Sequence, residues 1–165
     1  MTTAIIGVGN IGGALPRDLV RAGERVVLAA RDEAHAEAVA NELGDLATAA
    51  SVRDAIAAGD VVVRAIWLDQ SKELVPTIAD LLAGKVVVDP SKPIGFDDDG
   101  KPVRTLPDGV SAGYVVAGLV PAGARYVKAF GTLGAQSLAA EADRAPRRVL
   151  SMRPTTRLPG RLPDA

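Results

Sequence analysis

Short, mostly apolar runs alternate along the chain with longer stretches of mixed apolar and polar residues. Runs of this kind, bounded by glycine and other turn residues, predict strands of a parallel sheet, because such strands are buried on both faces. The predicted strands are residues 3–8, 24–30, 61–67, 85–89 and 124–130, with a weaker candidate at 46–49.

Most of the stretches between these strands have the spacing and end signals of helices. The predicted helices run from the glycine-rich turn at 7–12 to about Ala22, over 32–43, 51–58 and 111–119, and from Trp67 to about Ala83. Gly23 and Gly44 end two of them, and Ser51 with Asp54 forms a start that resembles a capping box. Because strands and helices alternate, the sequence predicts an α/β fold with a mainly parallel sheet.

Three features depart from this regular pattern. Residues 90–109 are rich in Pro, Gly and Asp, which predicts a structureless loop of a length that is usually functional or mobile. Pro16 falls inside the first helix, where it removes a hydrogen bond and crowds the carbonyl of Gly12. Arg64 interrupts a strand that should be buried on both faces, where an unpaired charge is costly. Either Arg64 is a functional cation, or it has replaced a Leu through a single base change in the codon.

Composition excludes several classes of protein. The chain has 165 residues, a net charge of −1, no Cys and one His. These numbers argue against nucleic-acid binding, thiol chemistry, a metal site built from Cys or His, and a Ser-His-Asp triad. No apolar run approaches the roughly 20 residues of a membrane span, and no leader sequence is evident. We therefore expect a cytoplasmic protein without nucleic-acid or membrane partners, whose chemistry comes from a bound cofactor.

The segment Gly7-Val8-Gly9-Asn10-Ile11-Gly12 closes the first strand and opens the first helix. This is the context of the dinucleotide-binding fingerprint, so the sequence predicts a doubly wound Rossmann-type fold. Gly7 permits the tight turn, Gly9 lets the backbone approach a pyrophosphate, and Gly12 lets the helix pack closely on the strand. With Asn10 and Ile11 at the helix N-terminus, these residues are the predicted phosphate-binding loop.

The end of the second strand indicates which dinucleotide binds. Enzymes that bind NAD usually place an acid there, whereas this strand ends in Ala30 followed by Arg31. An Arg at this corner accommodates the 2′-phosphate of NADP. His35, one helical turn further on, could add a donor, while Asp32 would oppose the phosphate. The alternatives are that Arg31 and His35 are solvated surface residues.

Two further segments should lie near the cofactor. In open α/β sheets the ligand lies outside the carboxyl ends of the strands. This places Ile66 and Trp67 at the site, together with the turn at 89–91. Trp67 either forms a wall for the nicotinamide half or covers the helix below it.

Five segments in order resemble the coenzyme F420-dependent NADP oxidoreductase family over residues 1–140. The segments are Ile5–Gly12, Ala30-Arg31, Ala65–Trp67, Gly84–Pro90 and Val127–Thr132. The resemblance implies a Rossmann domain that moves a hydride between NADP(H) and a deazaflavin, coenzyme F420 or a related acceptor. It assigns no catalytic acid or base, and catalysis would consist mostly of positioning.

The chain departs from the family at three positions. Ala30 replaces the usual Ser before the Arg, and Lys92 and Gly131 stand where Asn is usual. Two alternatives therefore stay open, a non-catalytic domain that binds NADP(H) and another NADPH-dependent reductase of the imine type. The expected partner is a small-molecule redox compound, and a homodimer is one possible assembly.

The last part of the chain differs in composition from the rest. Residues 144–165 contain six Arg, no Lys, four Pro and a single acid, Asp164. We expect a dinucleotide-binding domain over 1–150 and an irregular basic tail over 151–165. The family normally continues with a further strand and helices, so we expect a chain truncated at its C-terminus. For one choice of codons, a family-like continuation after Leu150 that is read one base out of frame encodes the residues found here from Ser151 to Arg157. We therefore hypothesise that the tail is frame-shifted.

Overall fold

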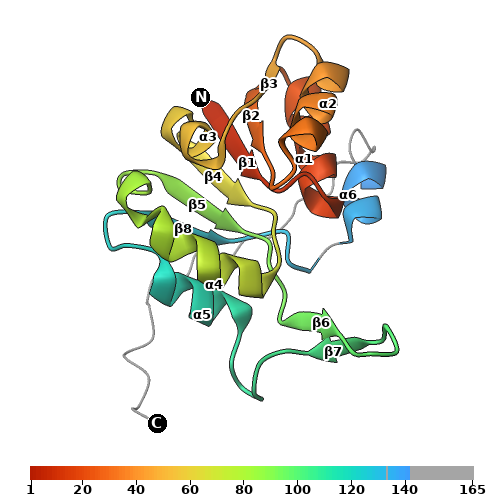
Figure 1. The fold of residues 1–165 in the computed structure, drawn as a ribbon, viewed down its shortest axis with the longest axis vertical. Helices are drawn as coiled ribbons and strands as arrows, with labels where there is room; N and C mark the ends of the chain where they lie inside the picture. The colour runs from red at the N-terminus through yellow and green to blue at the C-terminus, as the bar shows by residue number, and fades with distance from the viewer. Residues whose placement is uncertain (133, 142–165) are drawn as a thin grey trace.

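Six parallel strands form one sheet with helices on both faces (Figure 1). The computed structural model describes residues 1–132 and 134–141. The strands are β1 (Thr2–Ile6), β2 (Arg25–Ala29), β3 (Ala47–Ala49), β4 (Val61–Arg64), β5 (Val86–Asp89), β6 (Ile94–Phe96), β7 (Pro102–Arg104) and β8 (Arg125–Lys128). The helices are α1 (Asn10–Arg21), α2 (Glu33–Leu43), α3 (Val52–Ala58), α4 (Leu68–Thr77), α5 (Ala112–Leu119), α6 (Ala135–Glu141) and the short 3₁₀ helix η1 (Ala79–Leu81).

The strand order is β3-β2-β1-β4-β5-β8, and every neighbouring pair is parallel. The chain therefore builds the sheet outward from β1 in one direction, then crosses back to β4 and builds outward in the other. This is the doubly wound order, with its switch point between β1 and β4. The predicted fold class is confirmed. The first and fourth strands end earlier than predicted, at Ile6 and Arg64, because the backbone there turns toward the helices.

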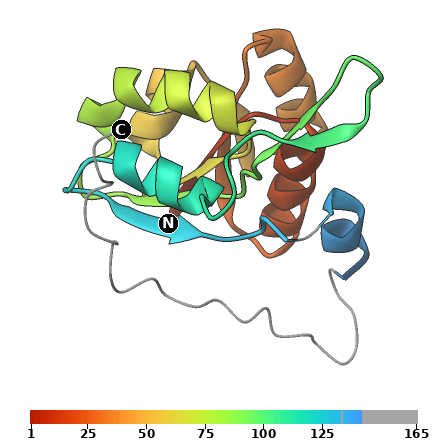
Figure 2. The ribbon, with the colours of Figure 1, turned by 90° about the horizontal axis from the view of Figure 1, so that it is seen from below.

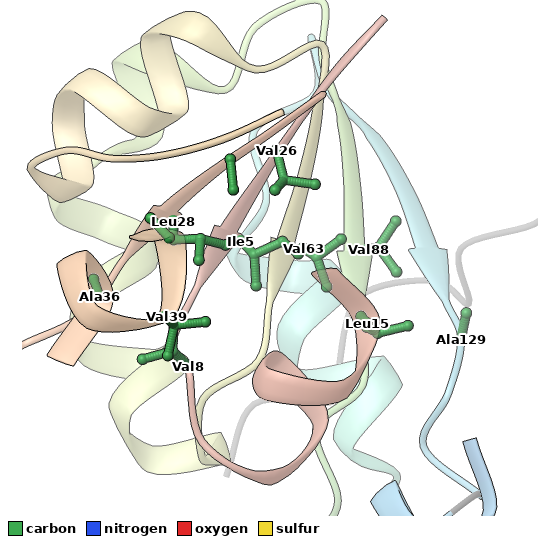
Figure 3. Close-up of a cluster of buried hydrophobic side chains, with 12 residues drawn as sticks. Ile5, Val8, Leu15, Val26, Leu28, Ala36, Val39, Val63, Val88 and Ala129 are labelled. Carbon is green, nitrogen blue, oxygen red and sulfur yellow. The ribbon is translucent and has the colours of Figure 1, made fainter. Parts of the chain in front are cut away.

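Two apolar layers hold the helices against the sheet. On one face, Ile5 and Leu28 pack with Leu15 of α1 and Val39 of α2 (Figure 3). On the other face, Ile6 belongs to a cluster with residues of α3 and α4, and α5 packs beside α4. Figures 1 and 2 show α4 and α5 on one side of the sheet and α1 and α6 on the other. Both faces are covered, which explains why the strand sequences are nearly continuous apolar runs.

Side-chain caps mark the helix starts that the sequence predicts. Asp32, Ser51 and Ser111 each accept a hydrogen bond from a backbone N–H in the first turn of α2, α3 and α5. Gly23 and Gly44 follow α1 and α2 with φ angles of 83° and 79°, a conformation that glycine adopts without strain. Helix α1 differs from the other three, because its N-cap is Gly9 and no side chain caps it.

The prediction of a structureless loop over residues 90–109 is wrong. Strands β6 and β7 pair as an antiparallel hairpin that projects from the body of the domain (Figures 1 and 2). The Asp97 carboxylate stabilises its turn by accepting from the N–H groups of Asp99 and Lys101. Gly100 has a φ of 76° in the same turn. These strands have three residues each, which is too short for their apolar positions to give a periodic signal.

Other departures also have local causes. Pro16 does lie inside α1, where it is buried. The helix predicted to reach Ala83 divides after Pro76 into α4 and η1.

Helix α6 was not predicted. Residues 142–165, which include the predicted basic tail and the whole of the segment hypothesised to be frame-shifted, lie outside the described residues. In the part of the chain that is described, no helix is long and apolar enough to cross a membrane.

The packing of α1 predicts unequal effects of adding a methyl group at two helical glycines. A Cβ on Gly12 would lie 1.7 Å from the carbonyl oxygen of Gly7, which is backbone and cannot move aside. Gly12→Ala should destabilise the protein by about 3 kcal/mol or more. Gly118 in α5 is the control, because a Cβ there meets nothing within 4 Å. Gly118→Ala should stabilise the fold by roughly 0.5–1 kcal/mol. Urea unfolding measures both, and equal effects would contradict this packing.

Candidate functional site

The turn between β1 and α1 presents an open helix N-terminus at the carboxyl edge of the sheet. Gly7 has a φ of 94°, and its N–H donates to the carbonyl of Ala29 at 2.7 Å, which ties the turn to the end of β2. The first N–H groups of a helix have no acceptor within the helix. Because no side chain caps α1 and its first turn holds no acid, these donors and the helix dipole suit an anion.

The three glycines of the turn have different surroundings. At Gly7, an added Cβ would lie 2.6 Å from the carbonyl oxygen of Ala65. At Gly12, an added Cβ would lie 1.7 Å from the carbonyl oxygen of Gly7. Packing alone therefore excludes side chains at both positions. At Gly9 an added Cβ would meet nothing within 4 Å. The open space in front of Gly9 leaves room for the role predicted for this residue, which is to let the protein backbone approach a pyrophosphate.

A cavity of about 580 Å³ lies at this edge of the sheet. It brings together six of the predicted site residues, namely Gly7, Gly9, Ala30, Arg31, Ile66 and Trp67. The predicted residues Asn10, Ile11, Gly12 and His35 are not part of its lining. The sequence analysis missed the remaining lining residues, Ile6, Val52, Ala65, Gln70, Glu73, Leu74 and Thr77. Four of these belong to α4, and their position over the cavity depends on how that helix packs.

Arg31 is the one cation in the lining of this cavity, and its side chain is exposed. None of the described residues forms a hydrogen bond or ion pair with it. The neighbouring Asp32 does not pair with it but caps α2, accepting from the N–H of His35 at 3.4 Å. Arg31 is therefore available to an anionic ligand, and Asp32 has a structural role that the sequence analysis did not assign.

Trp67 connects the cavity to the projecting hairpin. It directly follows the loop after β4, its backbone N–H donates to the Gln70 side chain at 3.2 Å, and it is 53% exposed. Its ring meets Phe96 of β6 edge to face, with centroids 5.9 Å apart. Phe96 is 60% exposed, so this aromatic pair presents an apolar surface beside the cavity. Of the two interpretations of Trp67, a wall of the site fits this exposure better than a cover for α4.

A second, smaller cavity of about 350 Å³ lies between the hairpin and the residues after β8. It is lined by Lys92, Pro93, Ile94, Pro102, Val103, Arg104 and Gly131. Lys92 and Gly131 are two of the three positions that depart from the family pattern. Two of the three departures therefore line this cavity, whereas the third, Ala30, lines the larger one. Phe130, beside Gly131, has a φ of 61°, a strained conformation for a bulky residue.

Four polar residues meet at the carboxyl ends of β4, β5 and β8, and we call them the Asp89 cluster: Arg64, Asp89, Tyr126 and Lys128. Asp89 accepts from the Tyr126 hydroxyl at 2.7 Å and from the Lys128 ammonium at 3.0 Å. Lys128 also donates to the carbonyl of Ser91. Arg64 lies 3.5 Å from the Asp89 carboxylate, with both side chains fully buried. The buried charge of Arg64 therefore lies beside an opposite charge, which the sequence alone did not indicate.

Burial changes the acid–base properties of this cluster. Loss of hydration lowers the pKa of Arg64 and the pKa of Lys128, and the nearby Asp89 carboxylate partly opposes this shift in each. Burial and Asp89 raise the pKa of Tyr126, so its phenol stays protonated and donates to the carboxylate. The cluster is thus a network of donors around the Asp89 carboxylate. Among the described residues there is no group of three His, Cys, Asp or Glu that could hold a metal.

Comparisons with known proteins found a matching family and several similar proteins. Residues 2–93 match the family described as "NADP oxidoreductase coenzyme F420-dependent". The F420-dependent NADP reductase of Methanothermobacter thermautotrophicus is 30% identical over 148 residues, which cover 84% of this chain. The chain spans 64% of the length of that relative.

Two solved structures are similar over most of this chain. A hypothetical protein from Sinorhizobium meliloti is 38% identical, with a TM-score of 0.75, over 87% of this chain and 68% of its own. A protein from Arthrobacter sp. assigned as an F420-dependent NADP reductase is 26% identical, with a TM-score of 0.75, over 89% of this chain and 69% of its own.

The aromatic pair yields a direct spectroscopic prediction, because Trp67 is the single tryptophan of the chain. Phe96→Ala should shift Trp67 emission to longer wavelength, since the indole loses a contact and gains water. The lost contact should cost about 0.5–1.5 kcal/mol of stability. Val103→Ala is the matched control, because Val103 is exposed on the other face of the same hairpin. An unchanged spectrum in Phe96→Ala would contradict the contact.

Proposed function

Because the chain belongs to the family of coenzyme F420-dependent NADP oxidoreductases, we propose that it binds NADP(H) in the 580 Å³ cavity and transfers a hydride between this cofactor and a deazaflavin of the coenzyme F420 type. The observation that carries this proposal is that the unpaired Arg31 lines the same cavity as Gly9, the residue at the N-terminus of α1, where no side chain caps the helix. Two anion-binding features on one cavity match the 2′-phosphate and the pyrophosphate of one dinucleotide.

The described residues fit each part of the cofactor. The N–H groups at the start of α1, with Asn10 and Ile11, would hold the pyrophosphate, and Gly9 leaves the space for it. Arg31 would hold the 2′-phosphate with charge-assisted hydrogen bonds. His35 is exposed one turn along α2 and would add a donor. Ala30 supplies no hydroxyl there, so the phosphate depends more on Arg31.

The chemistry itself comes from the cofactor pair. NADPH supplies a hydride, and an oxidised deazaflavin takes it up with a proton from solvent, leaving NADP⁺. The protein's task is to hold two flat rings in contact and to exclude water between them. Trp67 and Phe96 present the apolar surface for this beside the nucleotide cavity.

The assignment of NADP over NAD predicts a selective effect at Arg31. Arg31→Ala should weaken NADPH binding by roughly 1.5–3 kcal/mol, the range for hydrogen bonds to charged groups, and leave NADH binding nearly unchanged. Arg25→Ala is the matched control, because Arg25 is exposed at the opposite end of the same strand. Calorimetric titration of both cofactors measures the effect. Equal losses for NADPH and NADH would rule out the 2′-phosphate contact.

Mixing the protein with NADPH and an oxidised deazaflavin tests the full reaction. Deazaflavin and NADPH absorbance should fall together in the wild type. Gly9→Val is the control, since its side chain has room to fold but occupies the space proposed for the pyrophosphate. This variant should keep its circular dichroism spectrum and lose both binding and turnover.

The same assay separates the alternatives. Tight NADPH binding without deazaflavin reduction would contradict the proposed reaction and favour a non-catalytic binding domain. Turnover with an imine but not with a deazaflavin would favour an imine-type reductase. Binding that survives in Gly9→Val would show that the dinucleotide does not lie on this loop.

A further inference from the structure

The Asp89 cluster carries a buried positive charge that the proposed function has not used. Arg64 and Asp89 are 0% exposed, and Lys128 is about one-third exposed. Tyr126 is neutral, so two cations face one carboxylate. Charges that water does not reach are screened little by salt, and they act over longer distances than surface charges.

The Asp89 carboxylate cannot fully neutralise the positive charge of Arg64. This carboxylate already accepts hydrogen bonds from the N–H of Ser91, the Tyr126 hydroxyl and the Lys128 ammonium. Arg64 approaches one carboxylate oxygen at 3.5 Å without a hydrogen bond. Its three guanidinium nitrogens have no hydrogen-bond partner among the described residues. The guanidinium therefore contributes a local positive potential.

The position of Arg64 in the sheet directs this potential toward the nucleotide site. Arg64 pairs in register with Ile6, which lines the cavity, and it immediately precedes Ala65 and Ile66, which also line it. Asp89 and Lys128 pair in register on the neighbouring strands. The cluster thus lies under the carboxyl ends of β4, β5 and β8.

These three strands form the second half of the doubly wound sheet. In this fold each half receives one mononucleotide, and the loop after β1 with the end of β2 receives the adenosine half. The half with β4, β5 and β8 then receives the nicotinamide. The nicotinamide ring is positively charged in NADP⁺ and neutral in NADPH, while the phosphates of the two forms are the same.

We propose that Arg64 makes the nucleotide site select the redox state of its ligand, so that NADPH binds more tightly than NADP⁺. The inference rests on the proposed function and extends it from the identity of the cofactor to its oxidation state. Arg31 and the N-terminus of α1 contact groups common to both forms, so they cannot discriminate. Arg64 does not line the cavity, so it acts on the ring charge only through its electric field.

The consequence is a change in the redox balance of the bound cofactor. When the reduced form binds more tightly, the reduction potential of the bound couple rises. For this two-electron couple, each tenfold difference between the two dissociation constants raises it by about 30 mV. The equilibrium of hydride transfer on the protein then moves toward NADPH, and NADP⁺ is released more readily.

The test compares dissociation constants of NADP⁺ and NADPH, measured separately by calorimetry in wild type and variants. Arg64→Met removes the charge while keeping a long side chain. It should lower the ratio of the NADP⁺ constant to the NADPH constant by about three- to twentyfold, as expected for unit charges on the order of 10 Å apart. Asp89→Asn removes the opposing charge and should raise the same ratio. Tyr126→Phe removes a hydrogen bond of the cluster but no charge, and should leave the ratio unchanged.

Each outcome bears on a different claim. If neither cofactor form binds the wild type, the proposed function fails. If both bind and Arg64→Met leaves the ratio unchanged, the redox selectivity fails while the proposed function stands. A fall in the ratio for Tyr126→Phe equal to that for Arg64→Met would show a structural disturbance and also overturn the inference. Should Arg64→Met not fold, Asp89→Asn decides, because a ratio that does not rise contradicts the electrostatic account.

Discussion

The close approach of α1 to the ends of β1 and β4 is the constraint on which the site depends. Gly12 packs where a Cβ would lie 1.7 Å from the carbonyl oxygen of Gly7 and 2.9 Å from the Cβ of Ala65. Gly7 in turn holds the end of β2 through its hydrogen bond to Ala29. One turn therefore fixes three strands and one helix relative to each other. It also leaves the N-terminus of α1 uncapped and open toward the cavity, which is the feature that suits a phosphate.

The two arginines near the cavity, Arg31 and Arg64, differ in their exposure to solvent and so in how they can act on a ligand. Arg31 is exposed, unpaired and in the lining, where it can contact a ligand directly. Arg64 is buried behind the lining, where it can act only through the electric potential. An exposed ion pair contributes little to stability, whereas the field of a buried charge is screened less by water and salt. On the proposed function, Arg31 would contact the 2′-phosphate of the dinucleotide, while Arg64 would act on its nicotinamide ring.

Local sequence signals predicted much of the fold and six of the residues that line the cavity. The glycine turn, the helix start at Ser51 and the apolar runs are each readable within a few residues, and the structure places them as expected. Gln70 and Glu73 were missed because they reach the cavity only through the packing of α4 on the sheet. The partner of Arg64 was missed for a similar reason, since Asp89 becomes its neighbour only through the strand order. The hairpin was missed because its short, exposed strands need no apolar alternation.

Energy transfer from Trp67 to NADPH tests the central claim most directly, because the single tryptophan lines the cavity and its emission overlaps the absorption of the reduced nicotinamide. The measurement excites Trp67 during titration with NADPH and, separately, with NADH. The account predicts saturable quenching with matching emission from bound NADPH, at concentrations well below those needed for NADH. Quenching that does not saturate, or equal affinity for the two cofactors, would contradict it.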